Sequence, residues 1–303
     1  MIELPGDGGP GGPGGVVVQG ENLAVLAGLP DETFQLVYVD PPFNTGGRRD
    51  RRTLRVVRED PADEGAGDRT GFGGRRYTSV ETGRMSYPDR FEDYAGFLAP
   101  RLEEARRLLT RSGTLYVHLD WREAHYVKVL LDDVFGRDCF LNEVIWAYDF
   151  GGRARDRWPA KHDTILVYVK EAGAHLFDQD QVTRVPYLAP GLVGPEKAAR
   201  GKLPTDVWWH TIVPTAGREK TGYPTQKPEG VLRRVLEPSS RPGDLVLDFF
   251  AGSGTTGAVA AATGRRFVLV DENPEAVAVM RRRLPAGTRF VDPTGSDLQM
   301  SVT

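Results

Sequence analysis

The chain has 303 residues, of which 40% are hydrophobic and 27% are charged, and its formal net charge is −3. These values are ordinary for a globular protein, and no run of about 18 apolar residues that would cross a membrane occurs. The single cysteine, Cys139, excludes an internal disulfide, and the five histidines lack the spacing of a zinc site. We therefore expect a cytoplasmic protein that binds neither a metal ion nor a membrane.

The N-terminal part of the chain alternates expected strands and helices. Residues 1–15 are crowded with glycine and proline and are predicted to be a disordered tail. From 16 to 141, apolar runs at 16–18, 35–40 and 114–119 alternate with helical spacing, which predicts an α/β fold with a parallel sheet and helices on both faces. Within this half, residues 45–85 show little periodicity and much glycine and arginine, so a long mobile loop is expected.

The C-terminal part contains an irregular segment and a second regular one. Residues 142–222 lose the alternation, apart from a strand-like run at 165–169, and are predicted to be an insertion. Regularity returns in 223–290, which would be the cofactor-binding half, and 291–303 is expected to be a C-terminal tail. The predicted architecture is one Rossmann-like doubly wound sheet with an inserted region.

A glycine turn lies between an expected strand at 244–248 and an expected helix. Gly252 and Gly254 would let a ligand approach the backbone, and Asp271, at the end of the next strand, can accept hydrogen bonds from ribose hydroxyls. The spacing of a nucleoside triphosphate loop is absent, and Thr255 and Thr256 are expected to turn their hydroxyls toward the ligand. S-adenosylmethionine, which has a ribose but no phosphate, fits this pattern. The alternative is a tight turn without a ligand.

A second motif, Asp40-Pro41-Pro42-Phe43, follows an apolar strand. Its carboxylate would emerge at the carboxyl edge of the sheet, where open α/β folds bind their ligands. Two prolines stiffen the turn and leave the Asp40 carboxylate and the Pro41 carbonyl as acceptors for an amino group, while Phe43 offers a face to an aromatic base. The alternative is a proline-rich turn whose aspartate caps a helix.

Both motifs resemble those of the β class of DNA amino-methyltransferases, and especially the Mod subunits of type III restriction-modification systems. In that class the catalytic tetrapeptide precedes the cofactor glycines, as Asp40 precedes Gly252 here. Further stretches that resemble the family are Leu115-Tyr-Val-His-Leu-Asp120, Lys161-His162-Asp163, Asp206-Val-Trp-Trp209 and Tyr223-Pro-Thr-Gln-Lys-Pro228. The resemblance implies a circularly permuted methyltransferase domain in which the catalytic and cofactor strands lie side by side.

The resemblance also implies the residues of the site. Asp40, Pro41, Pro42 and Phe43 would be catalytic. The expected cofactor contacts are Glu21 (where the family usually has aspartate), Asp40, Thr225, Gln226, Lys227, Asp248, Phe249, Phe250, Ala251, Gly252, Ser253, Gly254, Thr255, Thr256 and Asp271.

Double-stranded DNA is the expected partner, and its target base must leave the duplex to reach such a site. The net charge of −3 offers little support, because the many arginines between 48 and 76 are mixed with acidic residues. Candidate DNA contacts are Asn44, Arg153, Arg155, Arg157, Lys161 and His162, for each of which a solvated surface position is the alternative. A homodimer and a cognate restriction endonuclease are further candidate partners.

The target base and two other classes stay open. Aspartate at the first catalytic position favours adenine N6 over cytosine N4 by family tendency. A cytosine C5 enzyme would need a cysteine nucleophile, whereas Cys139 follows Asp138 and is expected in the core. An NAD-dependent oxidoreductase could share the glycine turn and Asp271. A catalytically silent DNA-binding protein is the third alternative.

Overall fold

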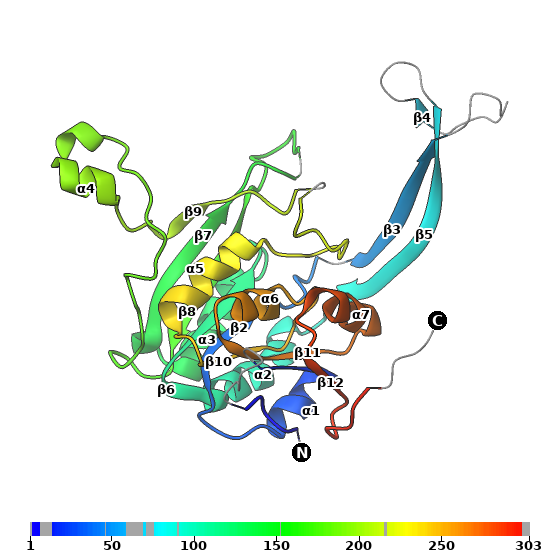
Figure 1. The fold of residues 1–303 in the computed structure, drawn as a ribbon, viewed down its shortest axis with the longest axis horizontal. Helices are drawn as coiled ribbons and strands as arrows, with labels where there is room; N and C mark the ends of the chain where they lie inside the picture. The colour runs from blue at the N-terminus through cyan, green and yellow to red at the C-terminus, as the bar shows by residue number, and fades with distance from the viewer. Residues whose placement is uncertain are drawn as a thin grey trace. The chain divides into compact units, whose positions relative to one another are not determined.

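The computed structural model describes residues 2–6, 14–45, 47–58, 69–70, 76–89, 91–151, 153–214 and 217–298, and for 47–89 the description is confined to the backbone. The chain divides into two compact units. The first comprises Met1–Phe43 and Asp93–Thr303, and the second comprises Asn44–Glu92. Figure 1 shows the elements of both.

The first unit is built on a nine-stranded sheet of order β12-β1-β11-β10-β2-β6-β8-β7-β9. In that order the strands are β12 (Arg289–Val291), β1 (Gly15–Gln19), β11 (Arg266–Asp271), β10 (Leu245–Asp248), β2 (Phe34–Val39), β6 (Leu109–Leu119), β8 (His162–Val169), β7 (Phe140–Ala147) and β9 (Val207–Trp209). The pairings from β12 to β6 are parallel, β8 is antiparallel to β6 and β7, and β9 is parallel to β7. The strand that precedes the catalytic motif therefore lies beside the strand that precedes the glycine turn, as predicted.

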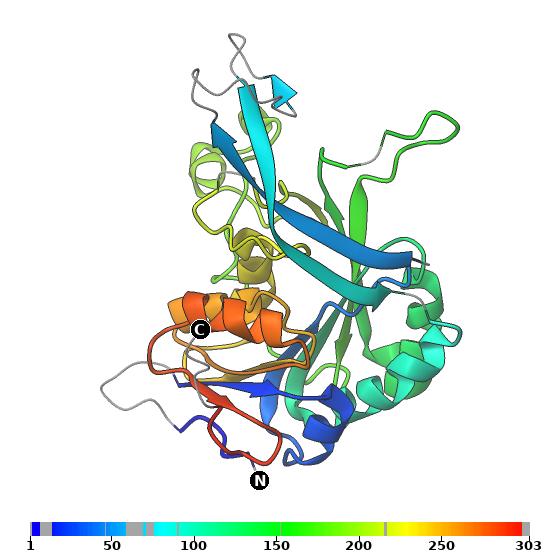
Figure 2. The same cartoon turned by 90° about the vertical axis from the view of Figure 1, so that its right-hand side faces the viewer.

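Helices cover both faces of this sheet (Figure 2). The first group, α1 (Asn22–Ala27), α2 (Tyr94–Leu108) and α3 (Ala124–Phe135), packs in sequence on one face. The second group, α5 (Glu229–Ser239), α6 (Thr255–Ala262) and α7 (Pro274–Arg283), covers the other. Because both faces are covered, the central strands are almost wholly apolar, and Leu36, Val37, Val246 and Leu247 have no exposed surface.

The carboxyl ends of the parallel strands define one edge of the sheet. Leu247 pairs with Val37 and Val39 pairs with Val117, so the residues that follow β10, β2 and β6 emerge together. Thr164 pairs with Leu119 across the antiparallel junction, which brings the start of β8 to the same edge. The connection between β7 and β8 therefore leaves the sheet at the edge that carries the catalytic motif.

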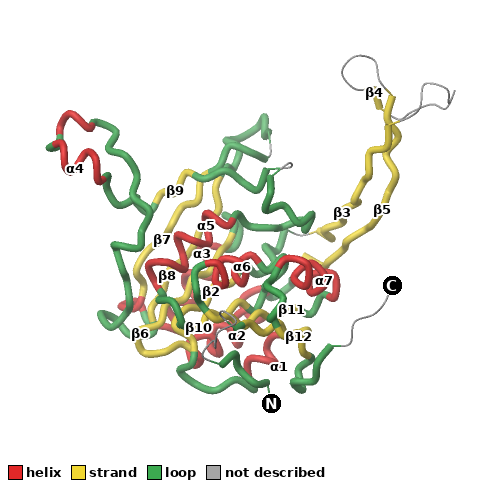
Figure 3. Tube along the Cα trace, in the orientation of Figure 1, coloured by secondary structure: helices red, strands yellow, loops and turns green. Residues whose placement is uncertain are grey.

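Three predicted boundaries are wrong. The expected N-terminal tail reaches into β1, and Ile2 is buried while Arg266 donates a hydrogen bond to the Pro5 carbonyl at 3.0 Å; residues 7–13 lie outside the described part. The expected insertion supplies β7, β8 and β9 to the main sheet, and the described connections between them are irregular apart from α4 (Pro195–Arg200) and a short 3-10 turn at Pro190–Leu192 (Figure 3). The expected C-terminal tail begins inside β12, and Leu298 donates to the Phe290 carbonyl at 2.8 Å.

The second unit differs from the loop expected at 45–85. Its backbone forms an antiparallel pair, β3 (Gly47–Arg58) with β5 (Arg76–Asp89), and β4 (Arg69–Thr70) also pairs with β5. The runs 53–57 and 77–80 contain the β-branched and aromatic residues that favour strands, a signal that the surrounding arginines and glycines concealed. No helix in the described ranges is long and apolar enough to cross a membrane.

Candidate active site

The catalytic motif leaves β2 directly after Val39. Pro41 is buried, and Asp40 is largely buried, with 15% of its side chain exposed. One carboxylate oxygen, Oδ2, is bound by the ammonium of Lys227. The other, Oδ1, is buried and has no hydrogen-bond partner among the described residues. A buried acceptor left unsatisfied is costly, so this atom indicates a site that takes a donor from a ligand.

Lys227 was expected to contact the cofactor. In the structure its side chain contacts the Asp40 motif, and its backbone contacts the residues of the glycine turn. Its ammonium binds Asp40 and lies 4.8 Å from the centre of the Phe43 ring. Its carbonyl accepts a hydrogen bond from the Thr255 hydroxyl at 3.2 Å, at the start of α6. The ammonium thus contacts both the Asp40 carboxylate and the Phe43 ring. This is the position in which we expected the amino group of a target base.

The glycine turn follows β10 and leads into α6. Gly252 and Gly254 have φ values of 50° and 72°, a region that residues with a Cβ rarely adopt. A Cβ on Gly254 would also lie 2.7 Å from Cγ of Met280. At the start of the turn, the Asp248 carboxylate accepts hydrogen bonds from the Thr256 hydroxyl at 2.6 Å and the Phe250 amide at 3.0 Å. Burial nevertheless raises the pKa of Asp248 to about 7.

Asp271 lies at the end of β11, beside the turn. Its two oxygens accept from the Gly252 amide at 2.7 Å and the Asn273 amide at 2.9 Å. Burial raises the pKa of this carboxyl, although both hydrogen bonds oppose the shift. Each carboxylate oxygen can accept two hydrogen bonds, so the pair keeps capacity for the two hydroxyls of a ribose.

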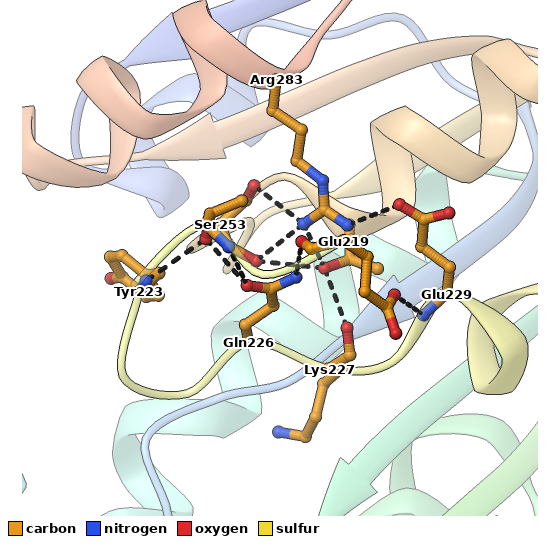
Figure 4. A network of polar contacts seen from close by, with 9 residues as sticks. Glu219, Tyr223, Gln226, Lys227, Glu229, Ser253 and Arg283 are labelled. Atoms are coloured by element: carbon orange, nitrogen blue, oxygen red, sulfur yellow. Dashed lines mark hydrogen bonds and ion pairs between the residues drawn. The ribbon is translucent and has the colours of Figure 1, made fainter. Parts of the chain in front are cut away.

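A polar network unites the segments around the turn (Figure 4). The Arg283 guanidinium donates to the Ser253 carbonyl and hydroxyl at 3.3 and 3.2 Å, and to the Thr255 hydroxyl at 2.8 Å. It also pairs with Glu229 at 2.9 Å. In this view the Lys227 ammonium points away from the network. Sequence reasoning missed Arg283, since nothing in the arginine run at 281–283 singles out one member.

Several expected cofactor contacts have side chains that bond within the protein. The Gln226 amide donates to the Glu219 carbonyl at 2.6 Å and accepts from the amide and hydroxyl of Thr221, both at 2.8 Å. The Thr255 and Thr256 hydroxyls, which were expected to face the ligand, bond within the protein to Arg283 and to the buried Asp248 respectively. The side chain of Thr225, by contrast, is half-buried.

Glu21 caps a helix. Its carboxylate accepts from the Leu23 and Ala24 amides at 3.1 and 2.8 Å, at the start of α1, and pairs with Arg101 at 2.6 Å. Next to it, Asn22 donates to the Phe249 carbonyl at 2.9 Å. Glu21 thus lies near the residues that follow β10, several of which are expected cofactor contacts, but both its oxygens already accept hydrogen bonds.

The candidate DNA contacts separate into three groups. Arg153, Arg155 and Arg157 are on the connection between β7 and β8, where Arg157 is exposed and makes only a loose ion pair with Asp156, at 3.8 Å. Lys161 closes the base of this connection by donating to the Asp149 and Gly151 carbonyls, both at 3.1 Å, while the half-buried His162 begins β8. Asn44 belongs to the second unit, where its amide oxygen accepts from the Phe91 amide at 2.9 Å.

A buried polar chain next to the catalytic motif was not foreseen, although two of its members lie in the family stretches. His118, in the apolar strand β6, bonds to the Tyr38 hydroxyl at 2.8 Å and to Asp163 at 3.1 Å. Its ring centre lies 6.1 Å from that of Phe43. The available signal was a histidine inside the otherwise apolar run at 115–119.

Cys139 lies at the other edge of the sheet. It precedes Phe140, which pairs with Tyr168, and Tyr168 in turn pairs with Leu115 at the beginning of the apolar part of β6. Its thiol is half-buried, not in the core as expected, because it ends a short turn after α3. A cysteine nucleophile is therefore not part of this site.

The fold is an α/β sheet of the nucleotide-binding type, and the site combines an acceptor motif with a neighbouring glycine turn. Comparison with known proteins identifies the class of protein. The N6/N4 DNA methylase family matches residues 34–282, most of the chain. The chain belongs to this family and is a DNA methyltransferase, as predicted, and DNA is its substrate. Its assignment to the family leaves no support for an NAD-dependent oxidoreductase.

Individual proteins of this class cover nearly the whole chain. The DNA adenine methyltransferase YhdJ of Escherichia coli (strain K12) is 28% identical over 287 residues, which span 90% of this chain and 84% of that protein. Among solved structures, the cytosine-N4-specific PvuII DNA methyltransferase aligns with a TM-score of 0.62 and 16% identity over 95% of this chain and 99% of its own. The putative DNA modification methylase TTHA0409 of Thermus thermophilus, complexed with S-adenosyl-L-methionine, gives 0.56 and 20% over 91% and 98%. These structural matches confirm the Rossmann-like methyltransferase fold.

Proposed function

We propose that this DNA methyltransferase transfers a methyl group from S-adenosylmethionine to the N6 amino group of an adenine that has left the DNA duplex. One observation carries the proposal. Oδ1 of Asp40, which has no hydrogen-bond partner among the described residues, lies at the end of β2, next to the strand that leads into the glycine turn. The ammonium on the other carboxylate oxygen lies over the Phe43 ring. This observation supports an acceptor for an amino group beside a nucleoside-type site.

The residues around the turn suit the cofactor. Gly252 and Gly254 permit the positive φ angles that shape the turn, and Asp271 retains acceptor capacity for ribose hydroxyls. Thr225 is placed by the loop that Gln226 holds in shape. When bound, the cofactor supplies a methyl group activated by a sulfonium. The prediction that the Thr225–Lys227 stretch touches it rests on the backbone, because the Gln226 and Lys227 side chains already have partners.

The chain's own residues orient the amino group. The Asp40 carboxylate and the Pro41 carbonyl accept its two hydrogens, which leaves the nitrogen lone pair directed away from both. As the nitrogen gains a fourth substituent it becomes positive, and a preorganised carboxylate stabilises that charge in a site with little water. Asp40 is also the nearest acceptor for the proton that the nitrogen finally releases. No covalent enzyme intermediate is required.

The Lys227 ammonium has to move away from Asp40 during this reaction. It is a donor with positive charge held by Asp40 and Phe43, so it imitates the amino group that the same two residues would bind. Binding of the base replaces this ion pair, and the flexible lysine stem permits the movement.

Adenine is favoured over cytosine by two facts. The first catalytic residue is Asp40, which tends to occur in adenine enzymes of the β class, and YhdJ is named an adenine methyltransferase. The PvuII enzyme, with the same fold, is specific for cytosine N4, so cytosine N4 is the alternative. A homodimer and a cognate restriction endonuclease stay predictions from the sequence.

Incubation of the purified protein with DNA and methyl-labelled cofactor tests the proposal. We expect label in DNA, recovered as N6-methyladenine after digestion, and about a 10²- to 10³-fold lower rate for Asp40→Asn. A matched control is Asp244→Asn, just before β10, where the carboxylate accepts from the Arg241 amide. N4-methylcytosine would overturn the choice of base, and full activity of Asp40→Asn would overturn the mechanism.

A further inference from the structure

A chain of four hydrogen-bonded side chains crosses the sheet beneath the catalytic motif. Tyr38 lies on β2, His118 on β6, Asp163 on β8, and Tyr148 directly after β7. The Tyr38 hydroxyl is 2.8 Å from Nδ1 of His118, Nε2 of His118 is 3.1 Å from Asp163, and the Tyr148 hydroxyl donates to the other oxygen of Asp163 at 2.9 Å. The neighbouring strands β2, β6 and β8 thus contribute one link each, and the residue after β7 contributes the fourth.

One assignment of protons satisfies every bond in this chain. Asp163 accepts from Nε2 of His118 and from the Tyr148 hydroxyl, and Nδ1 then accepts from the Tyr38 hydroxyl. Burial opposes ionisation of Asp163, but the hydrogen bonds from His118 and Tyr148 and the charge of Lys227 outweigh it and lower the pKa of that carboxyl. Burial also raises the pKa of both tyrosines, which keeps them as donors.

The chain bears directly on Phe43. His118 has no exposed surface, and its ring neighbours two aromatic rings: Phe43, whose centre is 6.1 Å away at an interplanar angle of 31°, and Trp146, which meets it edge-on at 5.5 Å. Trp146 is itself held by a hydrogen bond from its indole to the His210 carbonyl, at 2.7 Å. The position of the histidine ring therefore limits where the Phe43 ring can lie.

The other end of the chain reaches the connection between β7 and β8. The Tyr148 amide donates to the Lys161 carbonyl at 2.9 Å, closing the base of that connection, and Arg153, Arg155 and Arg157 lie within it. Apolar side chains of similar volume would fill this space without the need for four matched polar groups. A fully satisfied polar network instead defines a single arrangement of its members.

We propose that His118, held by Tyr38 and Asp163, is a positioning residue that fixes Phe43 for the target base, and that Tyr148 links this position to the β7–β8 connection. The inference rests on the proposed function, because it assigns Phe43 to base binding. It gives a role to residues that lie outside the catalytic motif.

A fluorine label tests the position of Phe43 without relying on activity. In the full-length protein carrying para-fluorophenylalanine at position 43, we expect one sharp ¹⁹F resonance, which broadens or divides in His118→Leu and shifts in Tyr148→Phe. His118→Gln, whose amide can accept from Tyr38 and donate to Asp163, should restore the wild-type signal. Tyr148→Phe removes one hydroxyl at the end of the chain, so it keeps the test decisive should His118→Leu fail to fold.

Kinetics with DNA provide the second readout. We expect kcat to fall about 10- to 100-fold in His118→Leu and less in Tyr148→Phe, with KM for the cofactor unchanged. The matched control is Tyr116→Phe on the same strand, which loses a buried hydrogen bond to Ser239 at 2.7 Å and should change neither signal nor kcat. An unaltered ¹⁹F resonance in both His118→Leu and Tyr148→Phe would overturn the inference. Absence of methyl transfer by the wild-type protein would instead overturn the proposed function and leave the ¹⁹F test valid.

Discussion

At the turn after β10, polar side chains bond to one another inside the protein, whereas the connection between β7 and β8 presents its side chains to solvent. Asp248, Asp271 and Arg283 each have partners at hydrogen-bond distance. On the connection, Trp158 is 95% exposed and Phe150 is 67% exposed.

The proposed function accounts for this difference through what each region would bind. A small cofactor needs a site of one shape, and internal hydrogen bonds supply it before the ligand arrives. A DNA duplex is large and negatively charged, and its phosphates pair with cations that the protein has left free. Both regions lie at the same edge of the sheet, so a single edge combines a preformed site with an open surface.

The largest expected effect concerns the buried carboxyl at the turn. The pKa of Asp248 is raised from 3.8 to about 7, so the folded protein binds more protons than the unfolded chain between these values. Its contribution to the free energy of unfolding is therefore present below pH 4 and lost as the pH rises through 7. Relative to wild type, Asp248→Asn should gain up to about 4 kcal/mol between pH 4 and 8, measured by urea unfolding at several pH values. Parallel curves for the two proteins would contradict this.

The second prediction removes a ligand acceptor from the same region. Asp271→Ala should raise the dissociation constant for S-adenosylmethionine about 10- to 100-fold, since hydrogen bonds to a carboxylate are lost. Isothermal titration calorimetry measures the change. The control is Asp292→Ala, after β12, where the carboxylate likewise accepts from the amides of its turn, from Thr294 at 2.8 Å and Ser296 at 3.0 Å. Equal affinities for the two variants would remove Asp271 from the cofactor site.

The third prediction addresses the open surface. Replacing Arg153, Arg155 and Arg157 together by glutamine should weaken DNA binding about tenfold at physiological salt and make the slope of log K against log salt shallower by up to about 2.7. Cofactor affinity should not change. The control replaces Arg111 and Arg137, which are exposed at the other edge of the sheet and paired with Glu171 and Asp132. If both sets of substitutions alter the salt slope equally, the connection has no special part in DNA binding.

The smallest effect is expected at Glu21, which separates a structural role from a cofactor contact. Glu21→Ala should lower the free energy of unfolding by about 1 kcal/mol through loss of the helix cap. Its effect on cofactor affinity should be smaller than that of Asp271→Ala, because both Glu21 oxygens already accept hydrogen bonds. Chemical unfolding and calorimetry on the same preparation give both values.

The sequence predicted the structure well where a short stretch contains residues with special backbone or hydrogen-bonding requirements. The glycine turn with Asp271 and the Asp40-Pro41-Pro42-Phe43 motif were both recognisable from backbone requirements and donor–acceptor chemistry, and the strands that lead into them are neighbours, as predicted. The strands at 47–58 and 76–89 were missed, since arginine and glycine masked their β-branched residues. The sheet membership of β7 and β9 was missed because Trp208 and Trp146 are paired across 62 positions, which no local pattern reveals.

The sequence by itself therefore determined the class of fold and located the Asp40-Pro41-Pro42-Phe43 motif and the glycine turn, because each depends on residue types at close spacing. The catalytic and cofactor-binding roles of the two motifs stay predictions. Tertiary structure alone decided which side chains meet. It brought the Lys227 ammonium to Asp40, gave Thr255 and Thr256 partners within the protein, and joined His118 to Asp163 beneath Phe43. The physical reason is that a buried polar group takes whichever partner the packing of distant strands provides, and that choice is absent from any single stretch of chain.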